Sequence, residues 1–272
     1  MKQKILLGIG ILSVLIILAS CTPGGGQNVG GGIGGNGLTL SWVPNVPPLQ
    51  LYDDQQFEAD VELTNNGAYT IGTSLDRIYI SGFSRERITG SFTDGQQLPP
   101  LEGQTRTVSG GKDVTIFKGN IAFLNTQNSY TIPLTATACY EYVTEAGGNI
   151  CIDPAPFTTS KRAKSCTAGT ITLGSQGAPV KVSSATAESS PGKTRITISI
   201  SNTGGGEAFK KETLPKCNPY SSARIEFSEQ DVILVEEINI GQRDLIGTCT
   251  GFMEGKHVRL LNGKGQLRCT YT

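Results

Sequence analysis

Apolar and polar residues alternate along several stretches of the chain, which is typical of strands that bury one face. In residues 57–64 the odd-numbered positions are apolar and most even-numbered ones are charged. The same period of two recurs in residues 194–201, where three isoleucines alternate with threonine and serine. Residues 130–140 and 232–240 follow a similar pattern. Helical periodicity is scarce after the first twenty residues, so the sequence predicts an all-β protein.

Turn-forming residues separate these predicted strands. Asn65-Asn66-Gly67 ends the first, residues 202–206 end the second, and residues 262–265 link the last two strands. Asn and Gly tolerate positive φ at low cost, which tight reversals between strands require. Short strands at regular spacing in a chain with 35 glycines favour two tandem, immunoglobulin-like antiparallel β-sandwiches.

The first forty residues have a different character. Lys2 and Lys4 precede an apolar run over residues 5–18, which is shorter than the roughly 20 residues that a membrane-crossing helix needs. A basic start followed by a short apolar core is typical of a secretory signal. Residues 1–20 are therefore predicted to be a signal peptide.

The sequence after the apolar core is Leu18-Ala19-Ser20-Cys21. It resembles the lipobox of prokaryotic lipoproteins. That resemblance implies cleavage between Ser20 and Cys21 and a diacylglyceryl group on the Cys21 sulfur. An ordinary signal or an uncleaved anchor with an incidental cysteine is the alternative. Two acyl chains on one residue are enough for stable attachment to the outer face of a cell membrane.

Residues 21–37 are predicted to be a tether, because nine of the last sixteen are glycine. A flexible coil of that length spans about 20–24 Å. The first sandwich is predicted over residues 38–156 and the second over residues 165–272. Residues 157–164 form the predicted linker. Its basic residues, Lys161, Arg162 and Lys164, are interpreted as a solvated linker.

A weak internal repeat supports this division. Residues 57–69 and 194–209 each contain an alternating strand followed by an Asn-x-Gly turn. The two segments resemble the immunoglobulin-like repeats of prokaryotic surface proteins, such as the CARDB-type adhesion-related domains. The resemblance implies a fold and an extracellular location, and it implies no ligand.

Seven cysteines are present, and assigning Cys21 to lipid leaves an even number for three disulfides. Cys139 and Cys151 flank a segment with Gly147-Gly148, which predicts a disulfide across a hairpin. Cys249 and Cys269 border the final hairpin and are the second candidate pair. Cys166 and Cys217 would then form the third. Six cysteines permit 15 pairings, so the last two assignments stay open.

Charge and residue types argue against several function classes. Lysines plus arginines equal acidic residues at 23 each, and loss of Lys2 and Lys4 gives 21 − 23 = −2 for the mature chain. No strong field is expected to attract nucleic acid. The cysteines have no CxxC spacing and His257 is the only histidine, so we expect no metal, cofactor or hydrolytic triad.

The remaining candidate residues are acidic pairs and aromatic side chains. The pairs Asp53-Asp54 and Glu236-Glu237 are adjacent, and neighbours on a strand point to opposite faces, so we expect solvated carboxylates. Trp42 reads as a buried residue of the first strand. Alternatively, Trp42, Tyr52 and Tyr69 could form a platform that stacks on sugar rings.

Together these features predict a non-enzymatic, lipid-anchored cell-surface protein with a structural, adhesive or protein-interaction role. Its expected partners are the membrane and other envelope or surface proteins. The alternative is a glycan-binding β-sandwich on the cell surface, with the three aromatic residues as its platform.

Overall fold

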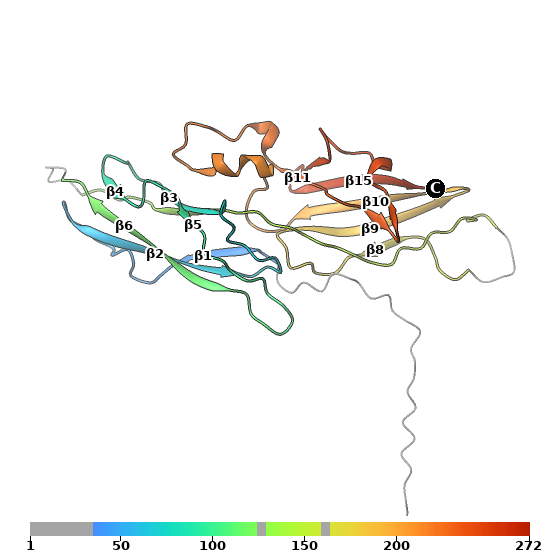
Figure 1. Ribbon diagram of the computed structural model, residues 1–272, viewed down its shortest axis with the longest axis horizontal. Coiled ribbons are helices and arrows are strands. Elements are labelled where there is room, and N and C mark those ends of the chain that lie inside the picture. The colour runs from blue at the N-terminus through green and yellow to red at the C-terminus, as the bar shows by residue number, and fades with distance from the viewer. Residues whose placement is uncertain (1–34, 124–128, 159–163) are drawn as a thin grey trace, which may run out of the picture.

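The computed structural model describes residues 35–123, 129–158 and 164–272. Its architecture is all β, and every paired strand is antiparallel. The molecule is elongated, with two groups of sheets placed end to end (Figure 1). The predicted signal peptide, Ser20 and the predicted lipidation site Cys21 lie outside the described residues.

The first group is a sandwich of two sheets. One sheet has the order β1-β2-β6-β4, formed by β1 (Leu38–Trp42), β2 (Gln56–Asn65), β6 (Lys112–Ile121) and β4 (Ile88–Gly90). The other has the order β5-β3-β7, formed by β5 (Gln96–Gln97), β3 (Arg77–Ser81) and β7 (Thr135–Cys139). The first order matches the A-B-E-D sheet of constant-type immunoglobulin domains. After β7 the chain continues to the second group.

Side chains from both sheets of the sandwich meet in one core. The alternation in β2 buries the apolar side chains that the sequence predicted, from Phe57 to Leu63. Phe117 of β6 lies opposite Ala59 and is fully buried. Phe92 packs against three aromatic rings, those of Phe57, Phe83 and Phe117, at centroid distances of 5.1–5.8 Å. This aromatic cluster holds the two sheets together.

The second group is built on one long sheet with the order β15-β10-β9-β8. Its strands are β15 (Lys264–Tyr271), β10 (Lys193–Asn202), β9 (Val180–Ser190) and β8 (Thr170–Thr172). Two short ribbons accompany it: β11 (Val232–Leu234) with β14 (His257–Arg259), and β12 (Asn239–Ile240) with β13 (Arg243–Asp244). Three short 3-10 helices are also described, η1 (Lys211–Cys217), η2 (Phe227–Glu229) and η3 (Ile246–Thr248).

Two strand predictions were too long. The strand predicted over residues 130–140 is limited to β7, because Pro133 has no N–H to donate to a ladder. The strand predicted over residues 232–240 is divided into β11 and β12, with Glu236 and Glu237 between them. The predictions for β2 and β10 are confirmed.

The predicted Asn-x-Gly repeat is also a structural repeat. The Asn65 side chain accepts a hydrogen bond from Gly67 N–H at 3.0 Å, and Asn202 accepts one from Gly204 N–H at 3.1 Å. Each amide also donates to the carbonyl four residues later, at 2.8 Å in both turns. The two turns therefore have the same local structure at corresponding ends of β2 and β10.

The division at residues 157–164 stays a prediction, and contacts cross it. Residues 144–153, assigned to the first sandwich by the sequence, lie along the second sheet. Thr144 Oγ1 donates to the carbonyl of Val180 at 2.7 Å, and Ile150 packs against the core of the second group. The chain thus reaches the second sheet well before the predicted linker.

Candidate functional site

Three disulfides join the six described cysteines, and two of the predicted pairings are wrong. The bonds are Cys139–Cys217, Cys151–Cys166 and Cys249–Cys269. The pairing of Cys249 with Cys269 is confirmed. Cys139 is not bonded to Cys151, because the chain after β7 leaves toward the second sheet and forms no hairpin. Three disulfides indicate that the protein occupies an oxidising, extracellular environment.

The Cys139–Cys217 disulfide fastens a segment of the second group to the first sandwich. We call residues 211–220 the strap. Lys211 Nζ lies 2.6 Å from the Glu141 carboxylate, just beyond the end of β7, and Cys217 is bonded to the last residue of β7. Tyr220 then reaches Phe83, which follows β3 at the opposite end of that strand pair. The strap therefore follows β7 along its length.

Tyr220 is the anchor at the far end of the strap. Its hydroxyl donates to the Phe83 carbonyl at 3.0 Å, and its ring lies 5.3 Å from the Phe83 ring. The guanidinium of Arg85 stacks 4.8 Å above the ring of Tyr220. The side chain packs against the first core, so a residue of the second group completes the first sandwich.

Residues 177–180 form the centre of the junction between the two groups, and we call them the hub. The Asn65 turn reaches the hub through Ala68, whose N–H donates to the Gly177 carbonyl at 2.7 Å. The Asn202 turn reaches it through Thr203, whose N–H donates to the Pro179 carbonyl at 2.7 Å. Both copies of the Asn-x-Gly repeat therefore meet on the same four residues.

Two tyrosines close the junction from the first group. The Tyr142 hydroxyl donates to the Gly177 carbonyl and accepts a hydrogen bond from Tyr69 N–H at 3.1 Å. The Tyr140 hydroxyl accepts one from Leu38 N–H at 3.2 Å. Burial raises the pKa of the Tyr140 and Tyr142 hydroxyls above the ordinary tyrosine value. Both groups therefore stay protonated, and able to donate, throughout the physiological range.

The turn glycine of the first repeat is required by this packing. A Cβ added at Gly67 would clash with the Tyr142 hydroxyl and would lie 2.9 Å from the Gly177 carbonyl oxygen. Gly204 in the second repeat lies similarly close to Pro179. The glycines that the sequence explains as turn residues also allow the close approach of the hub.

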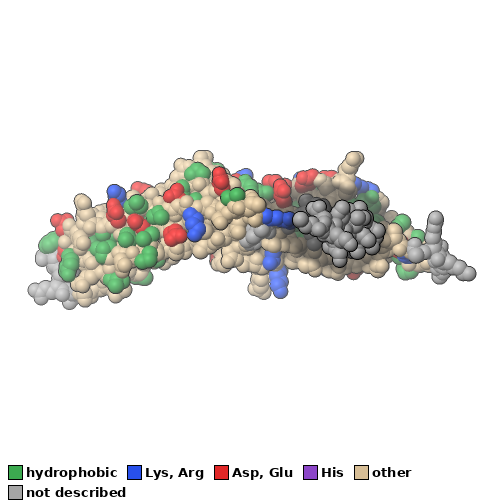
Figure 2. All heavy atoms as spheres, turned by 90° about the horizontal axis from the view of Figure 1, so that it is seen from below, with side chains coloured by type: hydrophobic (Ala, Val, Ile, Leu, Met, Phe, Trp, Pro, Cys, Tyr) green, Lys and Arg blue, Asp and Glu red, His purple; other side chains and the backbone are tan. Residues whose placement is uncertain are grey.

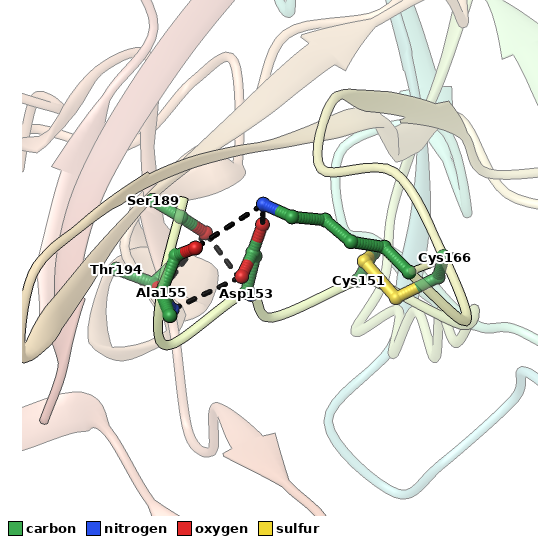
Figure 3. Close-up of a disulfide and its surroundings, with 7 residues drawn as sticks. Cys151, Asp153, Ala155, Cys166, Ser189 and Thr194 are labelled. Atoms are coloured by element: carbon green, nitrogen blue, oxygen red, sulfur yellow. Dashed lines mark hydrogen bonds and ion pairs between the residues drawn. A yellow bond between two sulfur atoms is a disulfide. The ribbon is translucent and has the colours of Figure 1, made fainter. Parts of the chain in front are cut away.

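A polar cluster fixes the chain against the C-terminal end of β9 in the second group (Figure 3). Lys164 forms an ion pair with Asp153 and donates to the Ala155 carbonyl at 3.2 Å. Asp153 N–H donates to Ser189 Oγ at 3.2 Å, at the end of β9. The hydrogen bond from Lys164 holds the pKa of Asp153 below its usual range. Lys164, predicted as part of a solvated basic linker, is thus paired.

The outer face of the second sheet carries only polar side chains around a shallow hollow of about 490 Å³. The lining residues are Thr186, Glu188, Arg195, Thr197, Ser199, Gln266 and Arg268. A larger hollow of about 890 Å³ shares Ser199 and Gln266 with it. The two hollows therefore adjoin, and together they cross three strands of the sheet.

The predicted aromatic platform is not assembled. Trp42 lies opposite Val61 at one end of β1. At the other end, Leu38 lies opposite Asn65, whose side-chain amide donates a hydrogen bond to the Tyr69 carbonyl. Four residues of strand separate these ends by about 13 Å. Tyr69 packs against the Tyr142 ring and contributes to the junction. Tyr52 is exposed in the loop before β2.

Trp42 is also more accessible than the sequence predicted. Its side chain is 36 % exposed, where a buried tryptophan was expected. β1 is an edge strand with only β2 beside it, so Trp42 is covered from one side. Seen from below, other hydrophobic side chains are scattered among acidic ones over the end that carries the first sandwich (Figure 2).

The residues considered for catalysis are divided between the two groups: Asp53 and Asp54 belong to the first, whereas His257 and the Glu236-Glu237 pair lie on neighbouring segments of the second. His257 begins β14, and its ring Nδ1 is 3.0 Å from the Glu254 carbonyl oxygen. Asp53 and Asp54 occupy the turn before β2, and the Glu236-Glu237 pair lies between β11 and β12. In the described part of the chain, no three His, Cys, Asp or Glu side chains are grouped as metal ligands.

Comparisons with known proteins add no relative. No protein-family model matches the chain, and neither the curated proteins nor the solved structures include a significant match. Among the described residues, no helix combines the length and hydrophobicity of a membrane span.

Sequence reasoning found the hub turns but missed most of the junction. The Asn-x-Gly repeat pointed to two equivalent turns, and nothing in it indicated that both contact residues 177–180. The strap contains Cys217, which has no other cysteine within 30 residues in the sequence. That isolation was the only sign that Cys217 forms a long-range disulfide. Tyr220 and Tyr142 belong to no periodic segment, so their roles were not predictable from the pattern.

Proposed function

We propose that this chain is an exported, lipid-anchored surface protein that acts as a stiff, non-enzymatic interaction module. The observation that carries the proposal is the junction, where the strap, the hub and the Cys139–Cys217 disulfide connect the two groups of sheets at several points. A protein that only needed two binding domains could join them with a flexible linker.

Stiffness follows from the number and kind of these connections. Flexing the junction would break the hydrogen bonds to Gly177 and Pro179 and would remove Tyr220 from the first core. Each such hydrogen bond contributes about 1 kcal/mol net, and the disulfide adds a covalent limit. A spacer of this kind holds binding surfaces at fixed separation, which suits contacts with other envelope or surface proteins.

The sequence supports the location. Cys21 follows an apolar core and the Leu18-Ala19-Ser20 sequence, and the six later cysteines are all disulfide-bonded. Lipidation at Cys21 would place the stiff module outside the membrane, in the same compartment in which its disulfides form.

The anchor is tested by intact mass spectrometry of the full-length protein extracted from membranes. The expected mass is that of a chain starting at Cys21 with two or more acyl groups, and Cys21→Ala should abolish both processing and acylation. An unprocessed, unacylated chain would contradict the proposed location.

The stiffness is tested by distance measurements between labels on unnatural amino acids at Lys118 in β6 and Lys193 in β10 of the oxidised protein. A single narrow distance distribution is expected, because the junction fixes both groups. A broad distribution would show a hinged molecule and would contradict the spacer. Crosslinking in the intact envelope, followed by affinity purification, then identifies the partner proteins.

A further inference from the structure

We propose that the polar outer face of the second sheet binds an acidic polysaccharide, with Arg195 and Arg268 receiving its carboxylates. This rests on the surface location proposed above and names a ligand class for the interaction module. The site lies on β9, β10 and β15, away from the aromatic residues Trp42, Tyr52 and Tyr69.

The strand register places the lining residues in three rungs across the sheet. Thr197 of β10 lies between Thr186 and Arg268, and Ser199 lies between Ser184 and Gln266. Arg195 lies opposite Glu188 in the remaining rung. Neighbouring strands are about 4.8 Å apart, and successive side chains on one face are about 6.8 Å apart. Hydroxyl, amide and guanidinium groups therefore form a regular polar grid.

The two arginines are diagonal neighbours on this grid. Arg268 is paired with Thr197, two residues from Arg195, which corresponds to a separation of about 7–8 Å between backbone positions. The Arg195 contact with Glu188 is 3.8 Å long and exposed, so it holds the guanidinium weakly. Arg268 donates to Gln266 at 3.2 Å. Both guanidinium groups keep free donors for bidentate recognition of a carboxylate.

Charge distinguishes this face from the other large sheet face. The lining of the two adjoining hollows includes Arg195, Arg268 and Lys264 against one acid, Glu188. The outer face of β2 instead carries three acids, Glu58, Asp60 and Glu62, with one lysine of β6, Lys118, ion-paired to Glu58 at 3.2 Å. Burial and the neighbouring Glu58 raise the pKa of Asp60. A polyanion is attracted to the second sheet and repelled from the first.

The chemistry of the lining selects among polyanions. The first hollow has no aromatic ring on which a nucleic acid base could stack, and no apolar side chain to anchor a protein hot spot. Its hydroxyl and amide groups match the many hydroxyls of a sugar chain, and its arginines match the carboxylates of uronic acids. The adjoining hollow extends the site for a polymer with the hydroxyls of Ser184, Ser201 and Thr203 and the Lys264 ammonium, and it also exposes the apolar side chains of Met253 and Leu261.

The experiment measures binding of alginate to the full-length oxidised protein in detergent, by calorimetry at 150 mM salt. Dextran serves as the neutral sugar, and single-stranded DNA and polyglutamate serve as polyanions without sugar carboxylates. We expect binding to alginate and none to dextran, and weaker binding to the other two polyanions.

Variants then locate the site. Arg195→Gln with Arg268→Gln should weaken alginate binding at least tenfold, and Arg195→Lys with Arg268→Lys should weaken it about threefold by removing the bidentate geometry. The matched control is Arg106→Gln with Arg224→Gln, which removes two exposed arginines outside the hollows and should change affinity less than twofold.

Several results would overturn the assignment. These are no alginate binding, equal losses in the control variant, tighter binding of DNA or polyglutamate, or self-association of the protein that the same substitutions abolish. In each case the narrow distance distribution expected for the spacer would be unaffected, so the two proposals fail separately.

Discussion

The two groups of sheets differ in how their buried side chains are arranged and in the number of disulfides that each contains. The first sandwich encloses fourteen buried residues of one core between two sheets, including the aromatic cluster around Phe92. In the second group one buried cluster contains Ile196, Leu245 and Cys269, with partly buried side chains around it, and Ile200, Val232, Val258, Leu260 and Leu267 are buried outside that cluster. Two disulfides lie within this second group. The second group thus divides its buried side chains between separate places and adds covalent cross-links, as other small exported domains do.

Each group also contributes a segment to the other, and the two segments differ in kind. The second group supplies the strap that covers β7 and inserts Tyr220 against the first core. The chain that leaves β7 contributes residues 144–153 to the second group, where Thr144 and Asp153 are hydrogen-bonded to β9.

The largest effect is expected from removing the disulfide between the groups. Cys139→Ala with Cys217→Ala opens a link across 78 residues, which corresponds to about 4.5 kcal/mol in the chain-entropy model. Calorimetry should show a lower free energy of unfolding and two separated transitions. Trp42, the only tryptophan, reports on the first group by fluorescence.

The matched control for that variant is Cys151→Ala with Cys166→Ala. This bond spans 15 residues and lies within the second group, so it should cost about 3 kcal/mol without separating the transitions. If both variants unfold in one step, the junction disulfide is not what couples the groups.

Truncation of core residues should reveal the difference in packing directly. Leu63 is fully buried in the first core, so Leu63→Ala should cost about 3 kcal/mol of unfolding free energy. Ile198 is only partly buried in the second, so Ile198→Ala should cost about 1–2 kcal/mol. Denaturant titrations measure both values, and equal losses would contradict the difference in burial between these two positions.

The hub is tested by adding one methyl group. Gly67→Ala places a Cβ against the Tyr142 hydroxyl and should cost about 1–3 kcal/mol through overpacking. Gly206 in the second turn has open space around it, so Gly206→Ala should change stability by less than about 0.5 kcal/mol. Thermal unfolding of the two variants decides whether the hub is tightly packed.

The smallest effect concerns the Asp153 carboxylate. Its pKa is lowered by Lys164, so this group contributes stability above its unfolded pKa of about 3.9, and the contribution is lost as pH falls through the lower folded value. Lys164→Met should flatten the dependence of Tm on pH below about pH 4. An unchanged pH profile would show that the ion pair does not form in solution.

The sequence predicted the parts of the fold that depend on local pattern. Alternation defined β2 and β10, and the Asn-x-Gly turns end both strands as expected. The Cys249–Cys269 disulfide was predicted because the two cysteines border one hairpin near the end of the sequence.

The wrong predictions of disulfide pairing and of Trp42 burial involve distant partners. Cys139 pairs with Cys217 because the strap returns across 78 residues, and no local pattern encodes that return. Trp42 is exposed because β1 has only one neighbouring strand, which depends on sheet order. The polar hollow is invisible in the sequence because its residues come from three strands that are paired only in the folded chain.

The point where the chain enters the described molecule has a mechanical consequence. Leu38 is held by the Tyr140 hydroxyl, and Gly37 accepts a hydrogen bond from Asn66 N–H at 2.7 Å, so the chain enters at the waist (Figure 1). The lipid anchor proposed above would hold the elongated module near its middle and leave both of its ends free. Two neighbours can then be engaged at once, and after the first has bound, the second meets a raised effective concentration.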